Sequence, residues 1–171
     1  NFGHSLNAAK RDRGTAASTV PTDFTEQAMQ AFLTARAIIN ENVGTEMTTA
    51  QMDLLLAQRD IALANWEKAI AATTVHYIND TIADYANFDA AEFDFANLAK
   101  HWSELKGFAI SLQFNRLSPL SDEEFEAINR LIGDAPVLAS AQVDTYIADL
   151  LMARSKLQAA YRFDTDHVAN W

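Results

Sequence analysis

The sequence has no cysteine among its 171 residues, and only five glycines and three prolines. The missing cysteine excludes disulfide bridges, thiolate metal ligands and a cysteine nucleophile. So few turn-forming residues cannot serve a sandwich or barrel built from many short strands. Basic residues are also scarce, with 13 Lys and Arg against 23 Asp and Glu and a formal net charge of -10. That charge repels phosphate backbones, so nucleic acid is not expected as a partner.

Long apolar runs are missing as well. No stretch approaches the roughly 18 consecutive apolar residues that span a bilayer, so no transmembrane segment is expected. The sequence opens at Asn1 without an initiator Met or the apolar core of a signal peptide, which predicts a mature product or a fragment of a longer protein. Residues 1–20 show no apolar periodicity, and we predict an extended N-terminal arm there, followed by one domain over residues 21–171.

What the sequence does contain is a set of helix signals. Capping-box patterns begin at Thr48, Asp89 and Ser121, each with Glu or Gln three residues later. Together with apolar residues at helical spacing, they predict helices from about Asp23 to Val43, Thr48 to Ala86, Asp89 to Asn115, Ser121 to Gly133 and Ser140 to Tyr161. The layout predicts an all-α fold, an antiparallel domain like a four-helix bundle with one extra short helix.

The residues that most suggest chemistry are His101 and Glu104. Residues three apart on a helix share a face, so this pair can present an imidazole and a carboxylate to one metal ion. His76 lies well inside the predicted bundle, with Asp80 and Asp84 following at steps of four residues. These side chains approach His101 if the second and third predicted helices are neighbours. A divalent metal or iron is the only cofactor that the residues suggest.

Two other interpretations compete with metal binding. In the first, the chain is a non-catalytic structural or protein-interaction domain in which His101 and Glu104 only pair within the bundle. In the second, it is a zinc-dependent peptidase-like hydrolase, which needs three protein ligands and a general base. The sequence has no H-E-x-x-H, and Leu105 breaks the inverted H-x-x-E-H form. Catalysis is therefore the least favoured of the three.

Several segments resemble one family. They are 100–108 (KHWSELKGF), 112–115 (LQFN) and 132–138 (IGDAPVL), with 65–69 (NWEKA) and 75–79 (VHYIN). They are similar to an uncharacterised bacterial branch of the imelysin-like proteins, and the resemblance runs from about Ala8 to Trp171. It implies helical bundles, usually two in one longer precursor, exported by Gram-negative bacteria and often lipid-anchored. This chain would be the C-terminal bundle, and its partner the preceding bundle or another protein.

The resemblance also bears on function. Imelysin-like proteins are associated with iron uptake, and their hallmark is a Gly-x-His-x-x-Glu motif proposed to bind metal. His101 and Glu104 match its His and Glu, while Ala99 stands where its Gly would be. The resemblance therefore implies an extracytoplasmic binding module, in the periplasm or at the cell surface, that is linked to iron or another metal.

Overall fold

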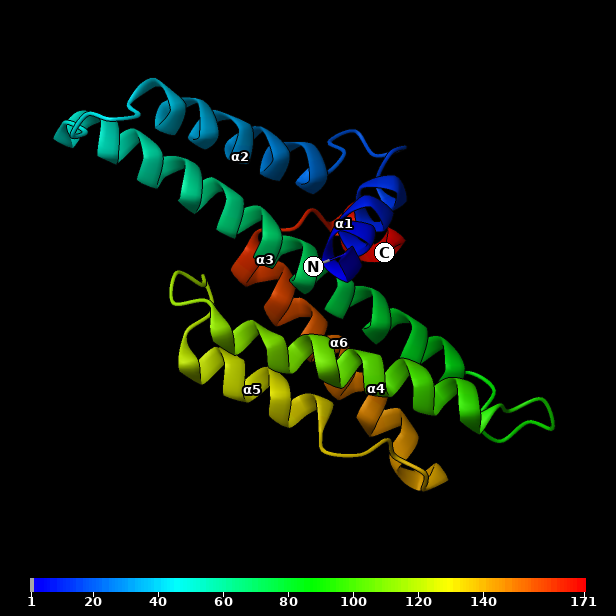
Figure 1. The fold of residues 1–171 in the computed structure, drawn as a ribbon. Helices are drawn as coiled ribbons and strands as arrows, with labels where there is room; N and C mark the ends of the chain where they lie inside the picture. Colours follow the sequence, from blue (N-terminus) through cyan, green and yellow to red (C-terminus); the bar gives the residue numbers. More distant parts are fainter. Residues whose placement is uncertain (1) are drawn as a thin grey trace.

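The chain is all-helical in the computed structural model, which describes residues 2–171 and their side chains from Ser5 onward. The elements are α1 (Phe2–Gly14), α2 (Phe24–Glu41), α3 (Thr49–Tyr85), α4 (Phe95–Ser111), the short 3-10 helix η1 (Leu112–Phe114), α5 (Asp122–Ile132), α6 (Ser140–Tyr161) and α7 (Thr165–Asn170) (Figure 1). The all-α prediction is confirmed. Within the described residues, no helix combines the length and the apolar character needed to cross a bilayer.

The 37-residue helix α3 runs through the whole molecule and divides it into two regions. Its C-terminal half packs with α4, α5 and α6 into a helical bundle, here called the body (residues 67–171). The largest fully buried side chains of the body come from all four helices: Ile78, Leu98, Leu105, Ile128, Ile132, Leu150 and Leu157. Burying such side chains is the main source of the stability of a helical bundle.

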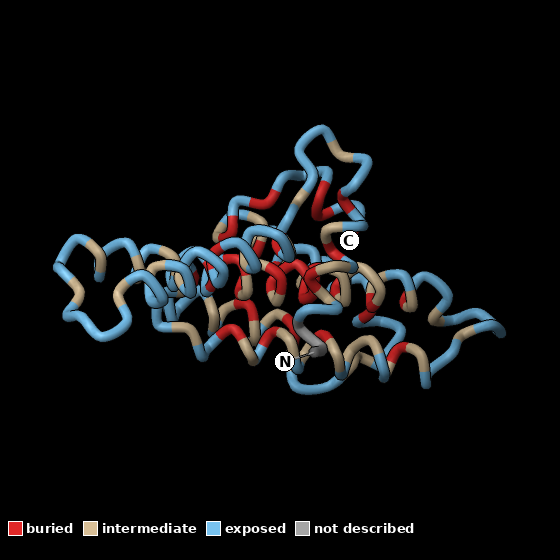
Figure 2. Tube along the Cα trace, turned by 45° about the horizontal axis from the view of Figure 1, so that its top comes forward, coloured by how far each residue is buried: buried red, intermediate tan, exposed pale blue. Residues whose placement is uncertain are grey.

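The N-terminal half of α3 pairs with α2 alone over most of its length. This helix pair, α2 with residues 49–66 of α3, is here called the arm, and it projects beyond the body (Figure 1). Its seam is built mostly from alanines. Ala31 and Ala62 are buried, Ala28 and Ala35 are half-buried, and Ile38 and Leu55 are half-buried beside them. The arm buries few residues. In Figure 2 its free end is almost entirely exposed or intermediate, while the body holds most of the buried positions.

A buried carboxylate marks the junction between arm and body. Glu67 is only 4% exposed and accepts hydrogen bonds from Tyr161 (2.6 Å), Ser118 (2.5 Å) and Asn115. Burial and the Glu67 carboxylate raise the pKa of Tyr161, which keeps its hydroxyl protonated as a donor. The cluster ties the α4–α5 connection and the end of α6 to the middle of α3.

Two of the three predicted capping boxes are present. Thr48 accepts a hydrogen bond from the backbone N–H of Gln51 and so caps α3, and Ser121 does the same for α5. The third is wrong. Helix α4 begins at Phe95 and is capped by Asp94, whose carboxylate accepts from two first-turn amides at 2.9 and 3.2 Å. Asp89 instead accepts a hydrogen bond from the side chain of Ser140 (2.8 Å), a tertiary contact that local sequence does not encode.

The prediction that residues 1–20 are extended is also wrong, because Phe2–Gly14 forms helix α1. Asn1 lies outside the described residues. One buried alanine, Ala8, and several polar contacts hold this helix in place. The Asp12 carboxylate accepts from the first two backbone amides of α2, at 2.8 and 3.0 Å, and the Trp171 indole donates to the carbonyl of Arg11 (3.0 Å). Apolar periodicity is the main sequence signal of a helix. A helix that is held mainly by polar contacts shows little of this signal and is hard to predict.

Candidate functional site

The C-terminal half of α3 and helix α4 lie side by side, as the metal hypothesis required, and bring His76 and His101 to a common carboxylate. The Nε2 atom of His76 lies 3.3 Å from Oδ2 of Asp80, and the Nε2 atom of His101 lies 3.8 Å from the same oxygen. The i,i+4 spacing of His76 and Asp80 places both on one face of α3. Two of the three predicted site residues are therefore brought together.

A second aspartate fixes the orientation of His101. Its Nδ1 lies 2.8 Å from Oδ2 of Asp84, whose other oxygen accepts a hydrogen bond from Asn97 (2.8 Å). Because a carboxylate only accepts, Nδ1 carries the proton and, in the neutral ring, Nε2 keeps its lone pair. The Asp80 carboxylate is on the Nε2 side of the ring. A carboxylate behind the outer nitrogen is the usual support of a metal-binding histidine.

Glu104, the third predicted residue, has a different neighbour. Burial, together with a hydrogen bond to Glu104, raises the pKa of Tyr77 to about 12. One carboxylate oxygen of Glu104, Oε2, is buried without a hydrogen-bond partner. Since His101 is hydrogen-bonded to Asp84, the direct pairing of His101 with Glu104 that the sequence suggested is not formed among the described side chains.

Helix α1 adds a cation to this cluster. Arg11 is 6% exposed, and its Nε is buried without a hydrogen-bond partner. Burial lowers the pKa of Arg11, while the neighbouring Tyr77 and Asp80 act in the opposite direction. Burial, followed by the Arg11 charge, also lowers the pKa of His76. The His76 ring is therefore neutral at pH 7, which is the form that binds a metal.

The sequence predicted part of this site. His76 and His101 are predicted site residues, and the four-residue spacing of Asp80 and Asp84 is visible in the sequence. The two aspartates were not predicted as site residues. Arg11 was missed entirely because residues 1–20 were expected to be extended. The one available signal for the aspartates was their four-residue spacing from His76, since the contact across to α4 depends on tertiary packing.

The cluster is not a finished metal site. Across the residues that the structure describes, no three His, Asp or Glu side chains are already grouped as ligands of one ion. Ligand atoms around a tetrahedral zinc ion stand about 3.4 Å apart. The His76–Asp80 separation of 3.3 Å matches this spacing, and the His101–Asp80 separation of 3.8 Å exceeds it by a few tenths of an ångström.

Comparisons with known proteins add no assignment to this geometry. No family model matches the chain, no curated protein matches it, and no solved structure matches it. The resemblance to imelysin-like proteins therefore stays a prediction, and the function has to be inferred from the side chains themselves.

Proposed function

We propose that this chain is an imelysin-like helical binding module that holds a divalent metal ion, iron or another, through His76, Asp80 and His101. One observation carries the proposal. The Nε2 atom of His101 and a carboxylate oxygen of Asp80 lie 3.8 Å apart, and an imidazole nitrogen and a carboxylate oxygen at this separation can share a cation as ligands. In line with the family resemblance, we place the module outside the cytoplasm, in the periplasm or at the cell surface.

The local charges also favour a divalent cation. Three carboxylates, those of Asp80, Asp84 and Glu104, surround the site, against the single buried cation of Arg11. Lys10 also acts electrostatically on His76, so with neutral histidines the formal charge of this group is -3 from the carboxylates and +2 from Arg11 and Lys10, which leaves -1. The excess negative charge attracts a cation, and Glu104, beside Tyr77, keeps one buried oxygen without a hydrogen-bond partner.

A second function is supported by a specific observation. Both histidines already contact aspartates, and His101 connects α4 to α3 through Asp84 without any metal. The same cluster can therefore serve a purely structural purpose in an interaction domain. The two proposals differ in whether the purified protein binds metal, not in the position of any side chain.

Metal binding is tested by titrating the chelator-treated protein with Fe²⁺, Zn²⁺ and Mn²⁺ in a calorimeter, alongside elemental analysis of the protein as purified. We expect one ion per chain. Asp80→Asn and His101→Ala remove direct ligands and should abolish binding, whereas Asp84→Asn should weaken it by about 10- to 100-fold because it only supports His101. Asp144→Asn, an exposed aspartate on α6, is the matched control and should leave binding unchanged.

The alternatives give different results in the same experiments. A wild-type protein that binds none of the three ions, and loses thermal stability on His101→Ala, contradicts the metal proposal and supports the structural one. Peptide hydrolysis that requires metal and disappears in Glu104→Gln supports the hydrolase instead. Metal binding without hydrolysis is the result that the binding module predicts.

A further inference from the structure

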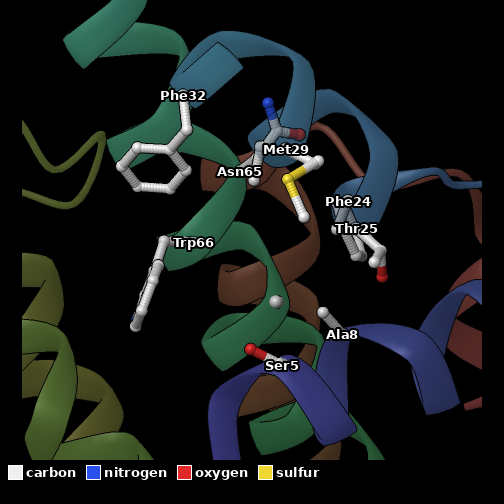
Figure 3. A pocket seen from close by; sticks show the side chains of 10 residues that line it. Ser5, Ala8, Phe24, Thr25, Met29, Phe32, Asn65 and Trp66 are labelled. Carbon is white, nitrogen blue, oxygen red and sulfur yellow. The ribbon is translucent and has the colours of Figure 1, made fainter. Parts of the chain in front are cut away.

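Helix α1 packs one face against α2 and α3, and that face carries a single charged residue. Ala8 and Arg11 are three residues apart, and Thr15 follows four residues later, so the three share one side of the helix. They are 9%, 6% and 1% exposed. Figure 3 shows Ala8 on this face, directed toward the hollow between α2 and α3. Arg11 therefore lies on the buried side of α1, where an arginine is rarely found unless it is paired.

The guanidinium of Arg11 has no such partner among the described residues. Its Nε is buried without a hydrogen bond, and the structure shows no hydrogen bond or ion pair for either terminal nitrogen in that part of the chain. Both terminal nitrogens keep some contact with solvent, since only Nε is fully buried. A guanidinium is permanently charged and carries five N–H donors. Burying one without acceptors costs free energy, which an acceptor from outside the chain would recover.

The groups around this guanidinium belong to the histidine cluster. Arg11 acts electrostatically on His76, and Tyr77 and Asp80 act on Arg11. The same Asp80 oxygen lies 3.3 Å from His76 and 3.8 Å from His101. The unpaired donors of Arg11 are therefore beside the ion that these three side chains hold under the proposed function.

Three protein ligands leave a metal ion open to a further ligand. A tetrahedral ion keeps one position free, and an octahedral ion keeps three. Water fills such positions by default, but a neighbouring guanidinium favours an oxyanion, to which it can donate two parallel hydrogen bonds.

The charge of the cluster changes sign when a metal binds. The three carboxylates, the neutral histidines, Arg11 and Lys10 together carry -1 without metal, and a divalent ion brings this charge to +1. An anion is therefore repelled by the metal-free cluster and attracted by the loaded one. The order of binding follows, with the metal first and the anion second.

We propose that the site binds its metal together with a small oxyanion, a carboxylate or carbonate, which bridges the metal and the terminal nitrogens of Arg11. This inference rests on the proposed function and adds the chemical class of the second ligand. The module then takes up a metal and oxyanion pair and not a bare ion, and Arg11 is the residue that selects the anion.

The coupling is tested by titrating the chelator-treated protein with Zn²⁺ in a calorimeter, in buffers that contain chloride only, acetate, bicarbonate or phosphate. The wild type should bind Zn²⁺ about tenfold more tightly in acetate or bicarbonate than in chloride. Arg11→Met should show no such gain. Complexes between free Zn²⁺ and the anion affect both proteins equally, so they cancel in the comparison.

The chloride buffer supplies a second difference. Because Arg11 places a positive charge beside the metal, Arg11→Met should bind Zn²⁺ at least as tightly as the wild type in chloride. Its thermal stability should be unchanged or raised, since a buried cation without a partner is removed. Arg13→Met is the matched control, because it changes the same residue type on the same helix at an exposed position, and it should keep the wild-type gain.

Linkage provides a reciprocal measurement on the anion itself. If acetate tightens the binding of Zn²⁺, then Zn²⁺ must tighten the binding of acetate by the same factor. Isotope-labelled acetate, followed by NMR, should therefore bind the zinc-loaded wild type about tenfold more tightly than the chelator-treated wild type. Zinc-loaded Arg11→Met should not show this increase.

Failure of this inference is distinguishable from failure of the proposed function. If the wild type binds Zn²⁺ equally well in all four buffers, the metal site stands and the oxyanion is excluded. A gain that Arg11→Met shares overturns the assignment to Arg11, and a larger gain in phosphate than in acetate or bicarbonate overturns the choice of anion. If the wild type takes up neither Zn²⁺, Fe²⁺ nor Mn²⁺ in any of the buffers, both proposals fail.

Discussion

The arm and the body are built from the same helix, α3, but bury different residues. In the body, leucine and isoleucine side chains such as Leu105 and Ile78 are fully buried between helices. In the arm, the fully buried contact residues are Ala31 and Ala62, while Phe32 and Leu56 remain largely exposed. Buried apolar area per residue is therefore much greater in the body. The difference shows that apolar content alone does not decide where the stable core lies, since the arm is also rich in apolar residues.

The largest effect should come from truncating a leucine in each region. Leu105→Ala removes a fully buried side chain from the body and should lower the free energy of unfolding by about 2–5 kcal/mol. Leu63→Ala, at 39% exposed in the arm, should cost about 1 kcal/mol or less. Urea denaturation followed by circular dichroism measures both. Equal costs would show that the arm is as tightly packed as the body.

Removing one helix cap from each region should give a smaller effect that differs in kind. Asp94→Ala removes the cap of α4 in the body and should lower global stability by about 1 kcal/mol. Thr48→Ala removes an equivalent cap in the arm, where we expect faster amide hydrogen exchange in the first turns of α3 but little change in global unfolding. Glu92→Ala, which removes an exposed carboxylate from the same loop, serves as the control for Asp94.

The smallest effect is a pH dependence that belongs to the body, because the arm contains no histidine. The pKa of His76 is lowered in the folded protein, so below its ordinary value of 6.5 the unfolded chain takes up more protons than the folded one. The stability that depends on a neutral His76 is present above pH 6.5 and is lost as the pH falls. Chelator-treated wild type should therefore lose stability on acidification, and His76→Gln should show a shallower loss. An unchanged slope would contradict the shift.

Local patterns predicted much of the fold. The caps at Thr48 and Ser121 rely on side chains only three residues from their partners, so sequence alone identifies them. The start of α4 was misplaced because Asp89 and Asp94 are both suitable caps, and the choice depends on a distant contact with Ser140. Helix α1 was missed because its key contacts lie outside the helix: Asp12 accepts from the start of α2, 12 residues on, and the carbonyl of Arg11 accepts from Trp171, 160 residues on.

The candidate site, like the fold, could be predicted only where the signal is local in the sequence. His76 and His101 were recognisable because histidine is rare in this chain and both lie on helices with acidic neighbours. The 2.8 Å contact of His101 with Asp84 links residues on two different helices, and nothing in the local spacing distinguishes it from a contact with Glu104. The assignment of partners therefore required the packing of α3 against α4.

The continuity of α3 has a mechanical consequence. The helix passes without interruption from the arm, through the hydrogen-bonded anchor at Glu67, to His76 and Asp80. At about 1.5 Å per residue, Leu56 and His76 are about 30 Å apart on one stiff rod. Glu67 lies between the two, about 16 Å along the helix from Leu56 and about 14 Å from His76. No loop separates the arm from the residues that carry the cluster, so the two share one continuous helix.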